Sequence, residues 1–296
     1  MSSASPAPAG DQTLFTIPNV SEGRDPDAIA AIGEAFTSTG ARLLDVHSDT
    51  DHHRTVYTLA AGGGEIAPAL VAGARECRRW IDLRGDRGCH PYVGALDVAP
   101  VVHLDAARRG AACVEALVAG EELGREGLAV FLYGALAGGR SRAQLRRGGA
   151  SALARRVAAG ELAPDFGPRA LDPQTGAVLV AARPPLVAFN VELRAPATLD
   201  DARAIAARIR EGGAEGLPGV RALGMQLAAR EPVAQVSTNV EDHVAVPLAA
   251  LVAAVARHAE VARCELVGLA PQAAFAGFPA AVEVRNRRTI EDALAG

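Results

Sequence analysis

The chain has 296 residues and a formal net charge of −4, and 49% of its residues are hydrophobic while 22% are charged. A chain with this many apolar residues and so little net charge can bury enough apolar surface to offset the conformational entropy lost on folding, which excludes disorder as its main state. Its length allows one large domain or two of ordinary size. The slightly acidic balance disfavours a nucleic-acid binder that relies on a strong positive field.

Arginine supplies all 30 basic residues, and the sequence contains no lysine. This excludes chemistry that needs an ε-amine, such as a Schiff base or a Walker-type phosphate loop. None of the four cysteines forms a CxxC pair, so zinc sites and thioredoxin-type redox sites lack their usual spacing. We therefore expect reduced thiols and no metal.

The first 12 residues have neither a basic region nor an apolar region of the kind found in signal peptides, so we expect a disordered leader there. No uncharged apolar run approaches the length of a membrane span. These two features predict a cytoplasmic protein without a membrane partner.

The first half of the chain alternates between strand and helix patterns. Apolar spacing predicts helices over residues 25–36, 66–81 and 113–123, the first of them capped by Asp25 and Pro26. Strand patterns precede or separate these helices, at residues 14–20, 41–49, 54–62, 93–104 and 129–136. Residues 141–183 are first rich in arginine and then in proline and glycine, which predicts an ordered loop.

The second half repeats the alternation. We expect strands over residues 186–193, 220–227, 234–240 and 264–271, and helices over 198–210 and 248–262. This β-α-β-β-α-β order is the split unit of a ferredoxin-like domain. The sequence therefore predicts an α+β fold with a leader over 1–12 and two subdomains, 13–183 and 184–296.

Seven segments, in the same order along the chain, resemble the formiminotransferase family: residues 17–25, 54–62, 90–102, 164–168, 186–193, 234–240 and 266–271. The resemblance implies two ferredoxin-like α/β sandwiches with a substrate channel between their facing sheets. It also implies transfer of a formimino group from N-formimino-L-glutamate to N5 of tetrahydrofolate, the co-substrate, in histidine breakdown. A homodimer is implied as well, and a separate cyclodeaminase is a candidate partner.

His90 matches the catalytic histidine of the family, and imidazole suits a reaction that takes a proton from one nitrogen and gives one to another. It follows a glycine-rich turn, and Pro91 biases it toward extended backbone. Without the resemblance, a turn histidine bonded to the backbone is the alternative interpretation.

Three departures from the family pattern lie near these motifs. The family usually has glutamate before the histidine and arginine after the proline, where this sequence has Cys89 and Tyr92. His47 stands where an aspartate is usual. Tyrosine cannot grip a carboxylate through two hydrogen bonds as arginine does. The departures keep two alternatives open: a paralogue with a different formimino or formyl donor, and a folate-binding module without turnover. Cys89 is interpreted as a small buried residue rather than a nucleophile.

The resemblance assigns folate binding to a loop made by Gly167, Pro168, Arg169, Leu171, Pro173, Thr175 and Gly176. Asn19 and Arg54 lie in matched motifs, and both contact with substrate and a structural role stay open for them. For Asn190 and Asn239 the open alternatives are lining of the channel and hydrogen bonding to the backbone. His52 and His53 are interpreted as surface residues. A solvated helix face is favoured over a substrate track for six arginines, at positions 140, 142, 146, 147, 155 and 156.

Overall fold

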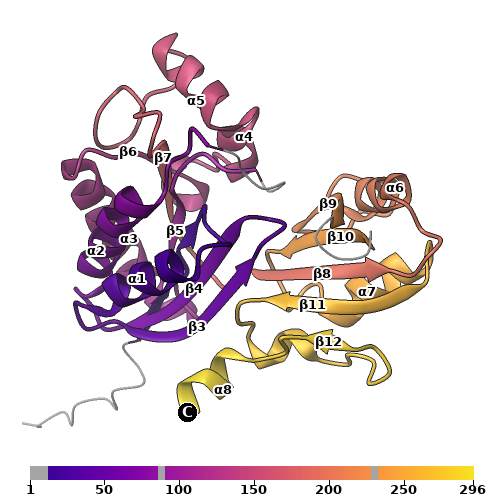
Figure 1. Ribbon diagram of the computed structural model, residues 1–296. Helices are drawn as coiled ribbons and strands as arrows, with labels where there is room; N and C mark the ends of the chain where they lie inside the picture. The colour runs from indigo at the N-terminus through magenta and orange to yellow at the C-terminus, as the bar shows by residue number, and fades with distance from the viewer. Residues whose placement is uncertain (1–12, 86–90, 228–232) are drawn as a thin grey trace, which may run out of the picture. The chain divides into compact units, whose positions relative to one another are not determined.

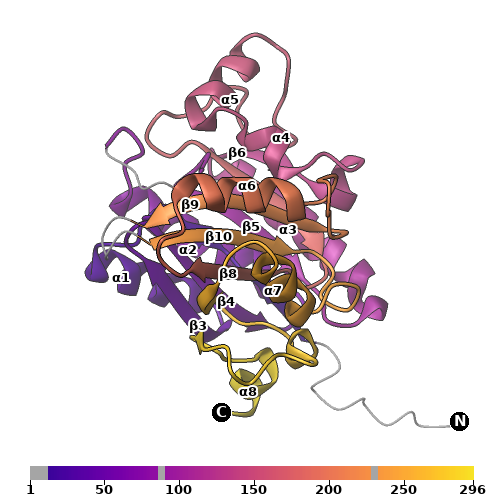
Figure 2. The same ribbon diagram turned by 90° about the vertical axis from the view of Figure 1, so that its right-hand side faces the viewer.

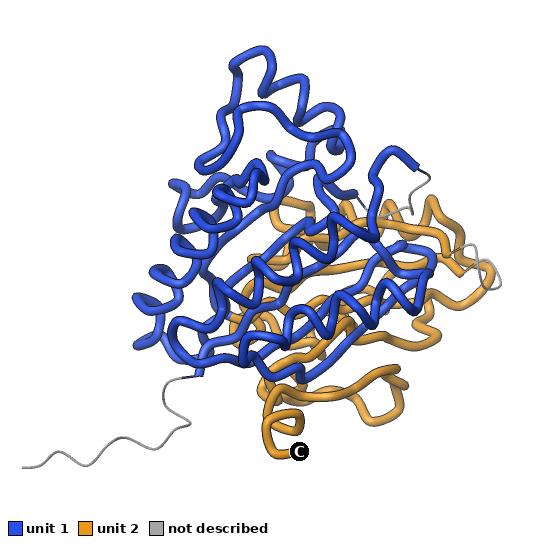
Figure 3. Tube along the Cα trace, turned by 60° about the vertical axis from the view of Figure 1, so that its left-hand side comes forward, with its two compact units in different colours: residues 1–184 blue, residues 185–296 orange. Residues whose placement is uncertain are grey.

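The computed structural model describes residues 13–85, 91–227 and 233–296. The chain forms two compact units: unit 1 ends at Pro184, and unit 2 is Pro185–Gly296 (Figure 3). Each unit has its own sheet and its own apolar core, and both mix helices with strands. This confirms the α+β fold class.

Unit 1 runs through one β-α-β-β-α-β cycle and then adds two parallel strands (Figure 1). Strands β1 and β2 both pair with β4 and β5, and the sheet continues through β7 to β6, while β3 pairs with β4 at the other edge. The elements are β1 (Leu14–Thr16), β2 (Asn19–Val20), α1 (Pro26–Thr37), β3 (Arg42–Asp49), β4 (Arg54–Ala61), α2 (Ile66–Trp80), β5 (Leu96–Val102), η2 (Ala106–Arg108), α3 (Arg109–Arg125), β6 (Ala129–Leu132), η3 (Gly134–Ala137), α4 (Arg142–Arg146), α5 (Gly149–Ala158) and β7 (Ala177–Arg183).

Helix α1 begins where the sequence predicts. The Asp25 side chain accepts hydrogen bonds from the amides of Asp27 and Ala28, at 2.9 and 3.3 Å, and Pro26 occupies the first turn, where its missing N–H costs nothing. Ile32 and Phe36 are fully buried, one turn apart on the face that packs on the sheet.

The two faces of the unit 1 sheet are covered differently. Helices α1, α2 and α3 share one core with the first face (Figure 1). On the second face, residues of α4 and α5 such as Leu145 and Leu153 pack on Val98, Phe131 and Leu179. The second face also carries polar side chains toward β2, β3 and β4, and these form the candidate site.

The prediction of a loop over residues 141–183 is wrong. Two helices and strand β7 lie within that range. Ser141 and Gln144 form a capping box that starts α4, and Leu145, Leu153 and Val157 supply enough apolar contact to hold both helices. Strand β7 lies between the parallel strands β5 and β6 and is buried on both sides, so it has no alternating pattern to reveal it.

Unit 2 has the predicted ferredoxin-like order, with β8 and β10 at the centre of the sheet β12-β11-β8-β10-β9. Figure 2 shows α6 and α7 side by side in front of its strands. The predicted helix over 248–262 is too long, because α7 ends at Ala256 and Val261 already begins a strand. The elements are β8 (Val187–Leu193), α6 (Leu199–Ile209), β9 (Val220–Leu227), β10 (Val233–Val240), α7 (Leu248–Ala256), β11 (Val261–Val267), η4 (Gln272–Phe275), β12 (Val284–Arg285) and α8 (Ile290–Ala295).

Candidate active site

Strand pairing brings three of the predicted site residues to one face of the unit 1 sheet. His47 lies opposite Val56 in β4, and Val56 lies opposite Asn19 in β2. Arg54 comes two residues before Val56, so its side chain points to the same face. His47, Asn19 and Arg54 therefore share the second face of the sheet, with His47 on its edge strand.

A buried carboxylate joins this group to the next strand. Asp97 in β5 is fully buried, and its Oδ2 lies 2.8 Å from Nη2 of Arg54 and also accepts a hydrogen bond from Arg146. The Arg54 Nε donates to Oδ1 of Asn19 at 2.8 Å. The four side chains Asn19, Arg54, Asp97 and Arg146 are called the Asp97 cluster below.

The Asp97 cluster has more positive than negative charge. Burial raises the pKa of Asp97, but Arg146 and Arg54 lower it by more, so the pKa lies below its ordinary value and the group is ionised. Burial lowers the pKa of Arg54 to about 10, where Asp97 opposes the effect and Arg146 adds to it. Arg54 stays charged at neutral pH, so the cluster holds two cations around one anion.

Asp97 also fixes the backbone that leads into the cluster. Its Oδ1 accepts a hydrogen bond from the amide of Val93 at 2.8 Å, and the hydroxyl of Ser21 donates to the carbonyl of Gly94 at 2.8 Å. Tyr92, next to Val93, is partly buried and packs against the core on the helix side. His90 and Cys89 lie outside the described residues, so their predicted roles stay predictions.

The predicted folate loop is held at both ends in unit 1. Near its start, the carbonyl of Phe166 accepts a hydrogen bond from the amide of Val130, and at its end Gly176 has a φ of +69°. A Cβ on Gly176 would lie 2.1 Å from the carbonyl oxygen of Val93, so only glycine fits there. Between these ends Gly167, Pro168 and Arg169 are exposed, Leu171 is partly buried, Pro173 is exposed and Thr175 is buried.

The loop 167–176, to which the resemblance assigns folate, bonds to residues on both sides of the segment 86–90, which carries His90. On one side the amide of Leu83 donates to the carbonyl of Gln174 at 2.9 Å. On the other side the amide of Ala95 donates to the carbonyl of Thr175, also at 2.9 Å. Leu83 and Ala95, which lie before and after the segment 86–90 in the sequence, are therefore both held by this loop.

The interpretation of His52 and His53 as surface residues is wrong, because both are buried. The ring of His52 lies 3.0 Å from Asp49, and Nδ1 of His53 accepts a hydrogen bond from the amide of Gly23 at 3.1 Å. His53 adopts a φ of +48°, so the two histidines shape the tight turn between β3 and β4.

The six arginines do not form a simple solvated face. Arg146 is partly buried and pairs with Asp97. Arg140 pairs with Asp165 and donates to the carbonyl of Leu132, and Arg156 donates to the carbonyls of Gln144 and Leu145. Arg147 and Arg155 are exposed. The guanidinium of Arg142 lies 5.7 Å from the ring centroid of Tyr133.

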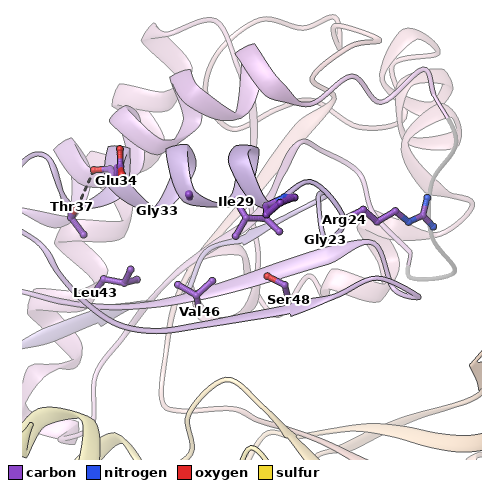
Figure 4. Close-up of a pocket in the computed structure, with 11 residues that line it drawn as sticks. Gly23, Arg24, Ile29, Gly33, Glu34, Thr37, Leu43, Val46 and Ser48 are labelled. Carbon is purple, nitrogen blue, oxygen red and sulfur yellow. Dashed lines mark hydrogen bonds between the residues drawn. The ribbon is translucent and has the colours of Figure 1, made fainter. Parts of the chain in front are cut away.

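A groove of about 620 Å³ lies on the first face of the sheet, between α1 and β3 (Figure 4). Ile29 and Gly33 line it from the helix, and Val46 and Ser48 line it from the strand. Because side chains alternate along β3, His47 points to the opposite face. The groove is therefore separate from the Asp97 cluster.

The sequence analysis did not predict Asp97 as a site residue, and it did not predict that Arg146 pairs with it. Asp97 is the one charged residue in the apolar strand β5, and a fully buried aspartate needs partners, so it could have been found from the sequence. Arg146 could not, because its partner is 49 residues away.

The described residues contain no group of three His, Cys, Asp or Glu side chains that could hold a metal ion. Within the same residues, none of the helices has both the length and the apolarity needed to cross a membrane.

Comparison with known proteins gives the family. Residues 13–183 match the N-terminal subdomain of the formiminotransferase domain, and residues 188–285 match the formiminotransferase domain. The chain belongs to the formiminotransferase family. It is 36% identical over 229 residues to a glutamate formimidoyltransferase of Streptococcus pyogenes, covering 75% of each chain, and 31% identical over 273 residues to one of Thermoplasma acidophilum, covering 88% of each.

The chain is also 38% identical over 274 residues to a formimidoyltransferase-cyclodeaminase of Gallus gallus. That match covers 88% of this chain and 50% of the relative, so the chain spans about half the length of such bifunctional proteins.

Proposed function

We propose that this chain transfers the formimino group of N-formimino-L-glutamate to N5 of tetrahydrofolate, a step of histidine degradation. The observation that carries the proposal is that the loop 167–176 bonds to Leu83 and Ala95, on either side of the segment that holds His90. Membership in the formiminotransferase family supplies the type of reaction.

In the proposed reaction, the lone pair of N5 attacks the formimino carbon and forms a tetrahedral intermediate. The bond between that carbon and the glutamate nitrogen then breaks. N5 must lose a proton, and the glutamate nitrogen must gain one to leave as an amine. We assign both proton transfers to His90, because the ordinary pKa of imidazole lies near neutral pH.

The other predicted residues receive substrate-binding roles in the same proposal. Arg54, with Asn19 beside it, offers a cation to the donor, and His47 lies on the same sheet face. The exposed Arg169 is assigned to the glutamate tail of folate. Tyr92 offers at most a single hydroxyl, which favours, as the second candidate, a family member that uses a different formimino or formyl donor.

The test is a transfer assay that follows the absorbance of 5-formimino-tetrahydrofolate. We expect turnover with N-formimino-L-glutamate in the wild type, and a kcat about 10²- to 10⁴-fold lower in His90→Ala, because that is the usual contribution of an acid-base group. His258→Gln is the control, since that histidine is exposed and pairs with Glu215. Turnover with another donor alone would select the second candidate, and full activity in His90→Ala would overturn the mechanism.

Two further points stay predictions. The resemblance implies a homodimer, and ring closure of the product would need a cyclodeaminase, which is the second activity named for the relative from Gallus gallus.

A further inference from the structure

The sheet of unit 2 carries a polar row on the face opposite its helices. In β8 and β10, the residues Phe189, Val191, Ala234 and Val236 face α6 and α7 in the core. Side chains alternate along a strand, so the residues between them point the other way. These are Asn190 and Glu192 in β8, Gln235 and Ser237 in β10, and Glu265 in β11, which the strand register aligns across the sheet.

The carboxylates of this row are paired. One oxygen of Glu192 lies 2.6 Å from Nε of Arg263, and the other accepts a hydrogen bond from Arg285. Glu265 accepts a hydrogen bond from Nδ2 of Asn190 at 3.3 Å, so Asn190 pairs with a side chain and not with the backbone through this bond. These charged groups thus satisfy one another.

Gln235 differs from its neighbours. It lies opposite Glu192 and is fully buried, at 0% exposure. Among the residues that the structure describes, neither its Oε1 nor its Nε2 has a hydrogen-bond partner. A buried amide without partners is destabilising, and an apolar side chain of similar length would avoid that cost. The described residues therefore leave both polar atoms of the Gln235 amide without a partner.

An amide presents one acceptor and a donor side by side, and it carries no charge. Its best partner is a planar group that offers a donor beside an acceptor in return. The carboxylates of Glu192 and Glu265 are balanced by Arg263 and Arg285, so the charges beside Gln235 cancel. An uncharged hydrogen-bonding edge is therefore the partner that suits the amide.

We propose that the Gln235 amide binds a planar edge of this kind on one of the two substrates of the proposed transfer, and the inference rests on that function. The pteridine ring of tetrahydrofolate has such an edge, with N–H donors next to a carbonyl acceptor. The formimino group of the donor is an amidine, which is protonated at neutral pH and offers donors only. The pteridine is therefore the ligand that the proposal predicts.

Calorimetric titration of the full chain with tetrahydrofolate alone, and with N-formimino-L-glutamate alone, tests the proposal without turnover. The variant is Gln235→Leu, with Gln235→Met as a second that preserves length. The control is Gln226→Leu, which removes an exposed glutamine from the adjacent strand β9. We expect the Kd of tetrahydrofolate to rise at least 10-fold in both Gln235 variants, while the thermal midpoint stays equal or rises.

A rise in Kd confined to tetrahydrofolate supports the pteridine as the ligand, and a rise confined to the donor would overturn that assignment. Dissociation constants within twofold of the wild type for both substrates would overturn the inference. A lower thermal midpoint with unchanged constants would also overturn it, because it would show a structural partner instead. If the wild type binds neither substrate, the proposed function fails, which is a different result.

Discussion

The two units both carry a buried carboxylate paired with two arginines on the sheet face away from the helices of the ferredoxin-like cycle, but the surroundings differ. In unit 1, Asp97 also accepts the amide of Val93 and so fixes the backbone near the segment of His90. In unit 2, Glu192 bonds to the side chains of Arg263 and Arg285, and the amide of Gln235 beside it has no partner among the described residues. The carboxylate in unit 1 thus holds a backbone amide as well as two arginines. The carboxylate in unit 2 holds two arginines and lies beside an amide that has no partner among the described residues.

Breaking the cluster of unit 1 should give the largest effect. In Asp97→Asn, Arg54 and Arg146 lose the charge that compensates them in a buried place, and we expect the free energy of unfolding to fall by about 3–5 kcal/mol. Urea denaturation measures the loss. Asp200→Asn is the control, because that aspartate is 90% exposed and its change should be near zero. A loss below 1 kcal/mol in Asp97→Asn would show that the cluster is not structural.

The matching change in unit 2 should cost less. Glu192→Gln leaves Arg263 and Arg285 without their full partner, but these side chains are 36% and 21% exposed and can be hydrated. We expect a loss of about 2–3 kcal/mol in the same denaturation experiment. A loss as large as that of Asp97→Asn would contradict the proposed difference between the two clusters.

The smallest effect concerns the turn between β3 and β4 and depends on pH. Burial raises the pKa of Asp49, but hydrogen bonds and the charge of His52 lower it by more, to about 2 from 3.8. Since the folded pKa is the lower one, the stabilisation is complete above pH 3.8 and disappears as the pH falls through 2. We expect Asp49→Asn to lose about 1–2 kcal/mol at pH 7 and to equal the wild type near pH 2.

Thermal unfolding of wild type and Asp49→Asn from pH 2 to 7 checks this. A difference that does not shrink toward acid pH would assign the effect to something other than the ionised carboxylate.

Local patterns in the sequence predicted much of the fold. Helix α1 follows from Asp25, Pro26 and the spacing of Ile32 and Phe36, and the order of unit 2 follows from its alternating segments. Strand β7 was missed because a strand buried on both faces has no period of two.

The site was predicted less completely. Motifs singled out Asn19 and Arg54, whose side chains are hydrogen-bonded in the structure, and their contact with substrate stays a prediction. Arg146 and Gln235 could not be assigned from local sequence. The role of Arg146, in helix α4, depends on its partner Asp97 in strand β5. The role of Gln235 depends on the lack of a partner among the described residues.

The central claim is that the formimino carbon moves from the glutamate nitrogen to N5 of the folate. Donor labelled with ¹³C at the formimino carbon, incubated with the wild type and tetrahydrofolate, tests this by NMR. The account predicts that the labelled resonance moves to the 5-formimino position of the folate in step with the release of glutamate. A label that stays on the donor, while tetrahydrofolate is shown to be bound, would contradict it.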